Sequence, residues 1–172
     1  MSEYSRTLRI DTIGSEPRAV AIAADAEERE ALAKRFGIAS LALLRADAAV
    51  GLEGGQVRAK GRVVAAFVQL CVATNVALPA TLDIPFDIVF RADIPAEAPD
   101  AGIELSETEC DIVFYEGGAI DLGEAAAQTL ALAIDPYPRA LGADAVLKAA
   151  GVLSEAQAGP FAALAALKRN DA

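Results

Sequence analysis

The sequence contains no histidine and only two cysteines, so it offers little material for catalysis or metal binding. Without histidine the chain cannot form a Ser-His or Cys-His catalytic pair, and it lacks the commonest metal ligand. Cys71 and Cys110 lie far apart in the sequence. We expect both to remain thiols, Cys71 as a core or half-buried strand residue; the alternatives are a disulfide or a catalytic thiol.

Phosphate-binding glycine motifs are also missing. The glycine-rich positions, 54–55, 117–118 and 123, match neither GxGxxG nor GxxxxGK[ST]. Together with the missing histidine, this predicts that the protein is not an enzyme. We expect no catalytic residue, no metal, no cofactor and no small-molecule substrate.

Long apolar runs are absent too, and none approaches the roughly 18 residues of a membrane span. The first six residues do not combine a basic region with an apolar stretch, as a signal peptide does. We therefore expect a cytoplasmic protein with no membrane partner. The 172 residues predict a single domain over residues 1–172. Only 5% of the residues are aromatic, so its core is expected to consist mainly of Ala, Val, Leu and Ile.

Negative charge dominates, with a formal net charge of −10 and a pI near 4.5. Proteins that bind nucleic acid usually present a basic face, because binding neutralises phosphates and releases their counterions. This chain is expected to repel phosphate unless its few cations cluster. Its overall charge favours a basic protein partner.

Two helices are indicated by their capping residues. Asp25 with Glu28, and Asp121 with Glu124, have the spacing of capping boxes, and this role also explains both pairs of acids. Gly37 suits the C-terminal end of the first helix. Prolines 136 and 138 end the second.

Strand-like segments fill much of the remaining sequence, with a hairpin turn at 53–55. They comprise residues 4–10, 19–23, 38–52, 56–73, 76–91 and 109–115. Prolines 79 and 85 place the segment 76–91 toward a sheet edge.

Residues 92–108 are expected to form an acidic, Pro- and Ala-rich loop. Residues 141–172 are expected to form a less ordered C-terminal region, with a short helix from Pro160 to about residue 168. The predicted fold is α+β: an antiparallel meander flanked by two main helices, with a short C-terminal helix.

The basic residues of the second long strand give the clearest candidate site. Arg58, Lys60 and Arg62 are spaced by two, so they project from one face of the strand, and Arg45 on the preceding strand is expected nearby. Such a stripe can contact RNA phosphates or a docking partner; the alternative is an ordinary solvated sheet face.

A second candidate consists of acidic residues. Glu107, Glu109 and Asp111 alternate along the chain and suit a cation or a basic partner; the alternative is a solvated loop edge.

Two segments resemble the YceD family, whose name is large ribosomal RNA subunit accumulation protein. Residues 119–138 are similar to its "IDLgelv…ll.LP..P" segment, here with Asp121, Leu122 and Glu124. Residues 159–168 are similar to its closing "NPFaaLa.LK", here with Pro160, Phe161 and Leu164. The order and the spacing of the two segments fit, and the strand-rich middle fits as well.

The resemblance implies a non-enzymatic role in the synthesis, processing or accumulation of 23S ribosomal RNA and in assembly of the large subunit. The implied partner is a ribosomal RNA precursor or a ribosomal protein. An alternative is an acidic module that docks a basic protein without touching RNA. The family commonly carries a C-x-R-C-L pair on its middle strand, but here Cys71 is followed by Thr74 at the second position. A zinc site needs about four N or S ligands, so a metal site implied for other members is not expected here.

Overall fold

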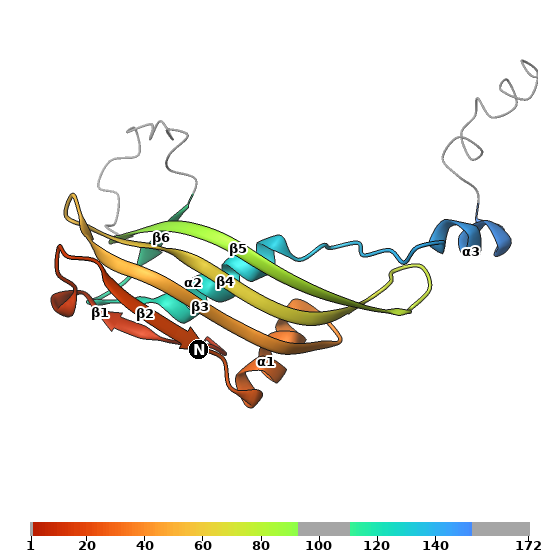
Figure 1. Cartoon of the computed structure of the whole chain (residues 1–172), viewed down its shortest axis with the longest axis horizontal. Coiled ribbons are helices and arrows are strands. Elements are labelled where there is room, and N and C mark those ends of the chain that lie inside the picture. The colour runs from red at the N-terminus through yellow and green to blue at the C-terminus, as the bar shows by residue number, and fades with distance from the viewer. Residues whose placement is uncertain (1, 93–110, 153–172) are drawn as a thin grey trace, which may run out of the picture. The chain divides into compact units, whose positions relative to one another are not determined.

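The computed structural model describes residues 2–92 and 111–152 (Figure 1). The chain forms two units, one comprising Met1–Gln69 and Pro79–Asp135, the other Leu70–Leu78 and Pro136–Ala172. The predicted acidic loop after residue 92, Cys110 and the predicted helix from Pro160 lie outside the described residues.

A five-stranded sheet with the order β2-β3-β4-β5-β6 forms the centre of the larger unit. The sheet is mostly antiparallel, as predicted. Its strands are β2 (Arg18–Ala23), β3 (Ser40–Glu53), β4 (Gln56–Leu70), β5 (Ala77–Ala92) and β6 (Ile112–Tyr115). The exception is β6, which pairs in parallel with the end of β5 and so is not part of the predicted meander. A parallel neighbour requires a long connection, and residues 93–111 supply one.

The turn between β3 and β4 has the residues that a tight hairpin requires. Gly54 and Gly55 have φ angles of 59° and 83°, and Glu53 pairs with Gln56 across the turn. Positive φ at both central residues matches the right-handed twist of the strands, and glycine adopts it without strain. The predicted turn is confirmed, and it sets the register of the two long strands.

The prolines of β5 lie on its outer edge. The Val89 N–H donates to the Asp111 carbonyl at 2.9 Å, so odd-numbered residues of β5 direct their backbone groups away from β4. Pro79 and Pro85 are odd-numbered, and β6 pairs only with β5 from Val89 onward. Their missing N–H groups therefore fall on a strand edge that no other described strand covers, which hinders pairing with another chain.

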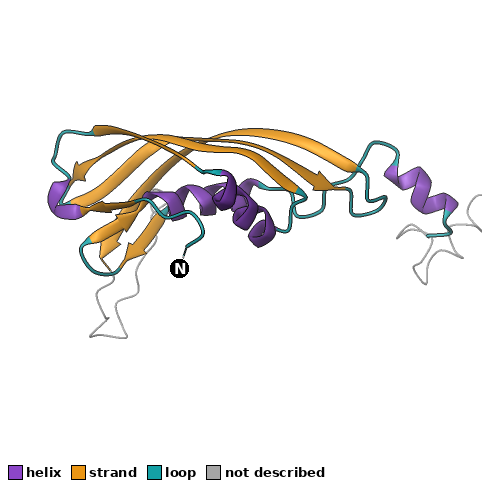
Figure 2. Ribbon diagram, turned by 90° about the horizontal axis from the view of Figure 1, so that it is seen from below, coloured by secondary structure: helices purple, strands orange, loops and turns teal. Residues whose placement is uncertain are grey.

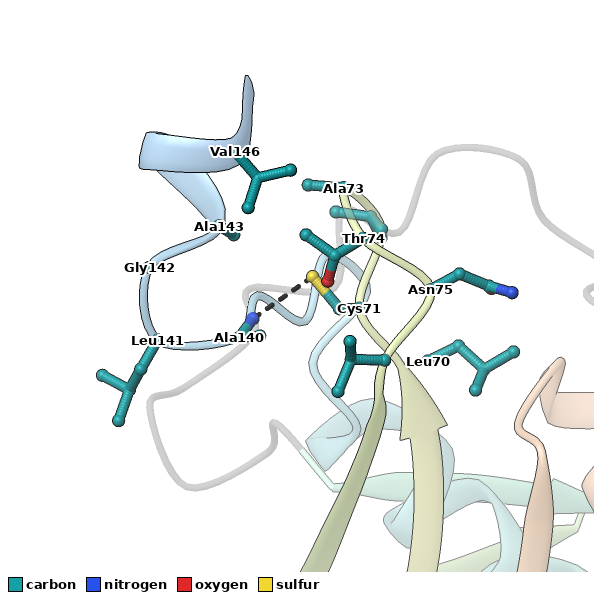
Figure 3. Close-up of a pocket in the computed structure, with 12 residues that line it drawn as sticks. Leu70, Cys71, Ala73, Thr74, Asn75, Ala140, Leu141, Gly142, Ala143 and Val146 are labelled. Atoms are coloured by element: carbon teal, nitrogen blue, oxygen red, sulfur yellow. Dashed lines mark hydrogen bonds between the residues drawn. The ribbon is translucent and has the colours of Figure 1, made fainter. Parts of the chain in front are cut away.

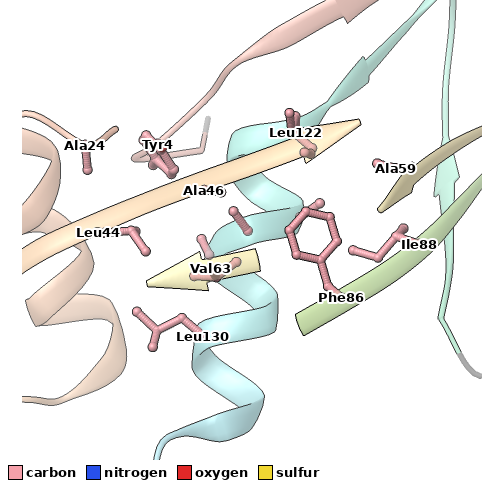
Figure 4. Close-up of a cluster of buried hydrophobic side chains, with 14 of the residues drawn as sticks. Tyr4, Ala24, Leu44, Ala46, Ala59, Val63, Phe86, Ile88, Leu122 and Leu130 are labelled. Atoms are coloured by element: carbon pink, nitrogen blue, oxygen red, sulfur yellow. The ribbon is translucent and has the colours of Figure 1, made fainter. Parts of the chain in front are cut away.

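Both helices of the larger unit, α1 (Ala26–Phe36) and α2 (Leu122–Ala133), cover the same face of the sheet (Figure 2). Their buried residues, among them Leu32 and Leu130, pack against the inward side chains of the strands. Figure 4 shows Leu130 and Leu122 facing Leu44 and other strand residues. Neither α1 nor α2 covers the opposite face, which we call the outer face (Figure 2).

The predicted helix caps are confirmed, except that the Glu124 side chain does not accept from the Asp121 N–H as a complete capping box requires. At α1 the Asp25 side chain accepts from the Glu28 N–H, Glu28 accepts from the Asp25 N–H, and Gly37 ends the helix with φ 65°. At α2 the Asp121 side chain accepts from the Glu124 N–H at 3.1 Å. The predicted return bond is replaced, because the Glu124 carboxylate binds Arg35 and Ser2 instead.

A second, two-stranded sheet was not predicted. Only Thr7–Arg9 of the expected first strand becomes β1, followed by a 3-10 turn at Ile10–Thr12, and β1 pairs with β7 (Ala119–Asp121). The start of the chain passes so close to α2 that a Cβ on Gly123 would lie 2.4 Å from the Tyr4 carbonyl oxygen. Glycine at 123 therefore permits this close approach.

The smaller unit contains α3 (Ala143–Ala149), a short C-terminal helix. Within the described part of the chain, no helix has the length and apolar character needed to cross a membrane.

Candidate functional site: the outer face of the sheet

Alternation along β4 sends the predicted cations to the outer face. Val57, Ala59 and Val63 are buried beneath the sheet, whereas Arg58, Lys60 and Arg62 point to the other side and are partly or fully exposed. Successive side chains of a strand point to opposite faces, so this follows from the spacing of two. The structure thus brings the three predicted cations together.

Each of these cations is already paired with a carboxylate. Arg58 makes a bidentate contact with Asp87 at 2.7 and 2.8 Å and also binds Glu53 at 2.9 Å. Lys60 lies 3.1 Å from the same Asp87 carboxylate. The Arg58 guanidinium, followed by Lys60, lowers the pKa of Asp87, which stays ionised at neutral pH.

Arg62, further along β4, is also paired with a carboxylate of β5. It binds Asp83 at 2.7 Å, and this contact lowers the pKa of Asp83 and raises that of Arg62. Arg62 also stands opposite Asp47 of β3 in the strand register. Asp83 and Asp87 were not predicted, although they lie four residues apart on the next strand, an even spacing that also places them on one face.

Arg45 lies on the same face but differs from the other three cations. It is exposed, stands opposite Val64, and makes no hydrogen bond or ion pair with the described residues. Together these residues form a charged zone with four cations and four carboxylates: Arg45, Arg58, Lys60, Arg62, Asp47, Glu53, Asp83 and Asp87. These eight residues carry no net charge among themselves in a protein of net charge −10, and Arg91 of β5 points to the same face beyond them.

An apolar zone adjoins the charged zone on β3 and β4. Outward positions after Arg62 are held by Val64, Ala66 and Val68, all half-buried, and Leu43, opposite Ala66, is 39% exposed. A sheet face turned to solvent is normally polar at such positions. The unbroken apolar run at residues 63–68 is the signal in the sequence that could have revealed this zone.

Residues at the start of α2 hold the start of the chain in place. The Asp121 carboxylate accepts from the Arg6 N–H at 2.8 Å and from the Ser5 hydroxyl at 2.6 Å. Leu122 is fully buried in the core. Glu124 accepts from both Arg35 Nη atoms at 2.6 and 2.8 Å, which, with Ser2 and Gln128, lowers its pKa to about 2.

Most of the remaining predicted site residues cannot be placed in the structure. Pro160, Phe161, Leu164, Glu107 and Glu109 lie outside the described residues, while the Asp111 carbonyl accepts from β5. Within residues 2–92 and 111–152, no three His, Cys, Asp or Glu side chains gather as a metal site would require.

Cys71 is a free thiol in the smaller unit and is buried as expected, but it follows the end of β4 and is not part of a strand. Its Sγ accepts from the Ala140 N–H at 3.2 Å. The neighbouring Thr74 hydroxyl and this amide lower the pKa of the Cys71 thiol to about 7.

Comparison of the chain with protein-family models, with curated proteins and with solved structures gave no match.

Proposed function

We propose that the protein is a cytoplasmic, non-enzymatic factor in biogenesis of the large ribosomal subunit, needed for accumulation of 23S ribosomal RNA. In this proposal it acts by binding a basic ribosomal protein on the outer face of the sheet. The role in ribosome biogenesis rests on the two YceD-like segments. The observation that supports the outer face as the binding surface is the juxtaposition of the charged zone and the apolar zone on a face that neither α1 nor α2 covers.

The charge balance favours a protein over RNA as the partner. RNA binding draws its free energy largely from cations that neutralise phosphates. On the outer face Arg58, Lys60 and Arg62 are already neutralised by carboxylates at 2.7–3.1 Å, so an incoming phosphate would compete with Asp83 and Asp87. A partner surface of mixed charge can instead match both signs, while its apolar side chains meet Val64 and its neighbours.

The excess negative charge adds long-range attraction for a basic partner. Residues 93–110 contain six acidic residues and no basic one: Asp93, Glu97, Asp100, Glu104, Glu107 and Glu109. Such a charge steers a basic protein toward the chain and repels RNA, and the effect weakens as salt rises. Ribosomal proteins that bind RNA carry the basic surfaces that this steering requires.

The test is a pull-down from cell lysate with the full chain, with and without RNase, in which bound proteins and RNA are identified. We expect a large-subunit ribosomal protein to remain bound after RNase treatment. Val64→Glu should reduce its retention at least about tenfold, as loss of a central contact does, whereas Arg45→Glu makes the face more acidic and should not weaken binding of a basic protein. Lys34→Glu, a charge reversal at an exposed position of α1, should bind normally.

The other outcomes overturn the proposal in different ways. Recovery of 23S precursor that RNase abolishes, with loss on Arg45→Glu but not on Val64→Glu, would assign the face to RNA. Loss of binding in Glu107→Lys/Glu109→Lys, with Val64→Glu unaffected, would move the contact to the acidic segment. Recovery of no large-subunit component in any sample would refute the ribosomal role itself.

A further inference from the structure

The smaller unit contains an open groove of its own. The groove has a volume of about 760 Å³ and lies between residues 70–76 and residues 140–146. Figure 3 shows Leu70, Leu141 and Val146 around it, with Cys71 and Thr74 at its base. The backbone supports this shape, because the Cys71 N–H donates to the Val76 carbonyl and the Val72 N–H donates to the Pro138 carbonyl.

Large apolar side chains of the groove are left exposed to an unusual degree. Val72 and Val76 are each 54% exposed, Val146 is 53% exposed, and Leu141 is fully exposed. Isolated exposed apolar residues are common, but a contiguous set of them around one groove indicates a surface that another apolar segment covers.

We propose that this groove is the docking site of the chain's own C-terminal segment, residues 159–168, which places Phe161, Leu164 and Leu167 against the groove. These three side chains recur every third residue, the spacing that places apolar residues on one side of a helix. The segment is otherwise mostly alanine, so the three side chains are its only large apolar groups. The chemistry of the segment therefore matches that of the groove.

The length of the chain allows this contact. Val152 follows α3, whose residues Ala143 and Val146 line the groove, and residues 153–160 connect Val152 to Phe161. Eight residues span up to about 30 Å when extended, which far exceeds the size of a groove of this volume. The same short connection keeps the segment at a high local concentration, so docking within one chain competes well with an external partner.

Cys71 provides a reporter at the base of the groove. Its pKa of about 7 means that much of the thiol is reactive thiolate at neutral pH, and the chain has only one other cysteine. Cys71 is only 2% exposed beneath the residues of the groove, so in a Cys110→Ser background its alkylation by iodoacetamide requires residues 70–76 and 140–146 to separate, which a docked segment prevents. A segment that is docked about 90% of the time should slow alkylation about tenfold, because only the undocked fraction reacts.

The experiment compares full-length variants in that background. Phe161→Asp/Leu164→Asp should speed alkylation about tenfold, and Ala166→Asp, on the opposite side of the same predicted helix, should not. A substitution in the groove itself, Val146→Asp, should speed alkylation as much as Phe161→Asp/Leu164→Asp does. Ala145→Asp, at an exposed neighbouring position, should leave the alkylation rate unchanged. Circular dichroism identifies any variant that has unfolded.

Equal alkylation rates in Phe161→Asp/Leu164→Asp, Ala166→Asp and the parent would overturn the proposal. Protection that grows with protein concentration would overturn the intramolecular contact, because it would identify the segment of a second copy as the occupant. This outcome is independent of the pull-down, so docking of the segment and the ribosomal role succeed or fail separately.

Discussion

Replacing Glu124 by glutamine should destabilise the protein in a pH-dependent manner. Its carboxylate receives both Arg35 Nη atoms and the Ser2 hydroxyl, and the side chain is 23% exposed. These contacts, led by Arg35, lower its pKa from 4.5 to about 2. The ion pair connects α1 to α2, and Ser2 fastens the start of the chain to the same carboxylate.

The magnitude follows from the pKa shift. Each pKa unit corresponds to about 1.4 kcal/mol of preference for the charged form in the folded state, which gives an upper value of about 3 kcal/mol. Solvent screens a pair that remains partly open to water, so we expect about 1–2 kcal/mol. Because the folded-state pKa is below the unfolded one, this stabilisation is present above about pH 4.5. It is lost as the pH falls toward 2.

The assay is urea unfolding followed by circular dichroism at pH 7 and pH 3. Glu124→Gln should lower the free energy of unfolding at pH 7, and the difference from the parent should fall to less than half by pH 3. Glu30→Gln is the matched control, because its partner Lys34 is an exposed neighbour on one helix and the pair is solvated. The result that would falsify this reasoning is a Glu124→Gln variant with the parent's stability at pH 7, or with an unchanged difference at pH 3.

Two further predictions concern the sheet. Gly61→Ala should destabilise the protein by about 1–3 kcal/mol in urea unfolding, because a Cβ there would lie 2.1 Å from the Asp47 carbonyl oxygen and force β3 and β4 apart. Gly118→Ala, where a Cβ meets nothing within 4 Å, should be tolerated, and equal stability of the two variants would contradict the packing argument. Pro79→Val/Pro85→Val should restore N–H groups to the free edge of β5 and promote self-association, measured by light scattering. A monomer at all concentrations would show that the prolines do not protect this edge.

Local structure could be read from the sequence wherever neighbouring residues decide it. The boundaries of α1 follow from Asp25, Glu28 and Gly37, whose hydrogen bonds and φ angle involve residues within one turn. The β3–β4 hairpin follows from Gly54 and Gly55, since only a short segment has to adopt the turn. The spacing of Arg58, Lys60 and Arg62 likewise determined that they share one face of a strand.

The tertiary structure decided which distant segments meet, and this changed the interpretation of the candidate site. The pairing of β1 with β7, the parallel direction of β6 and the contact of Arg35 with Glu124 depend on long-range packing that no local pattern encodes. The same holds for Asp83 and Asp87, which turn the basic stripe into a charged zone without net charge. Their positions beside β4 depend on the register of β5, and a shift of one residue would turn both carboxylates to the opposite face.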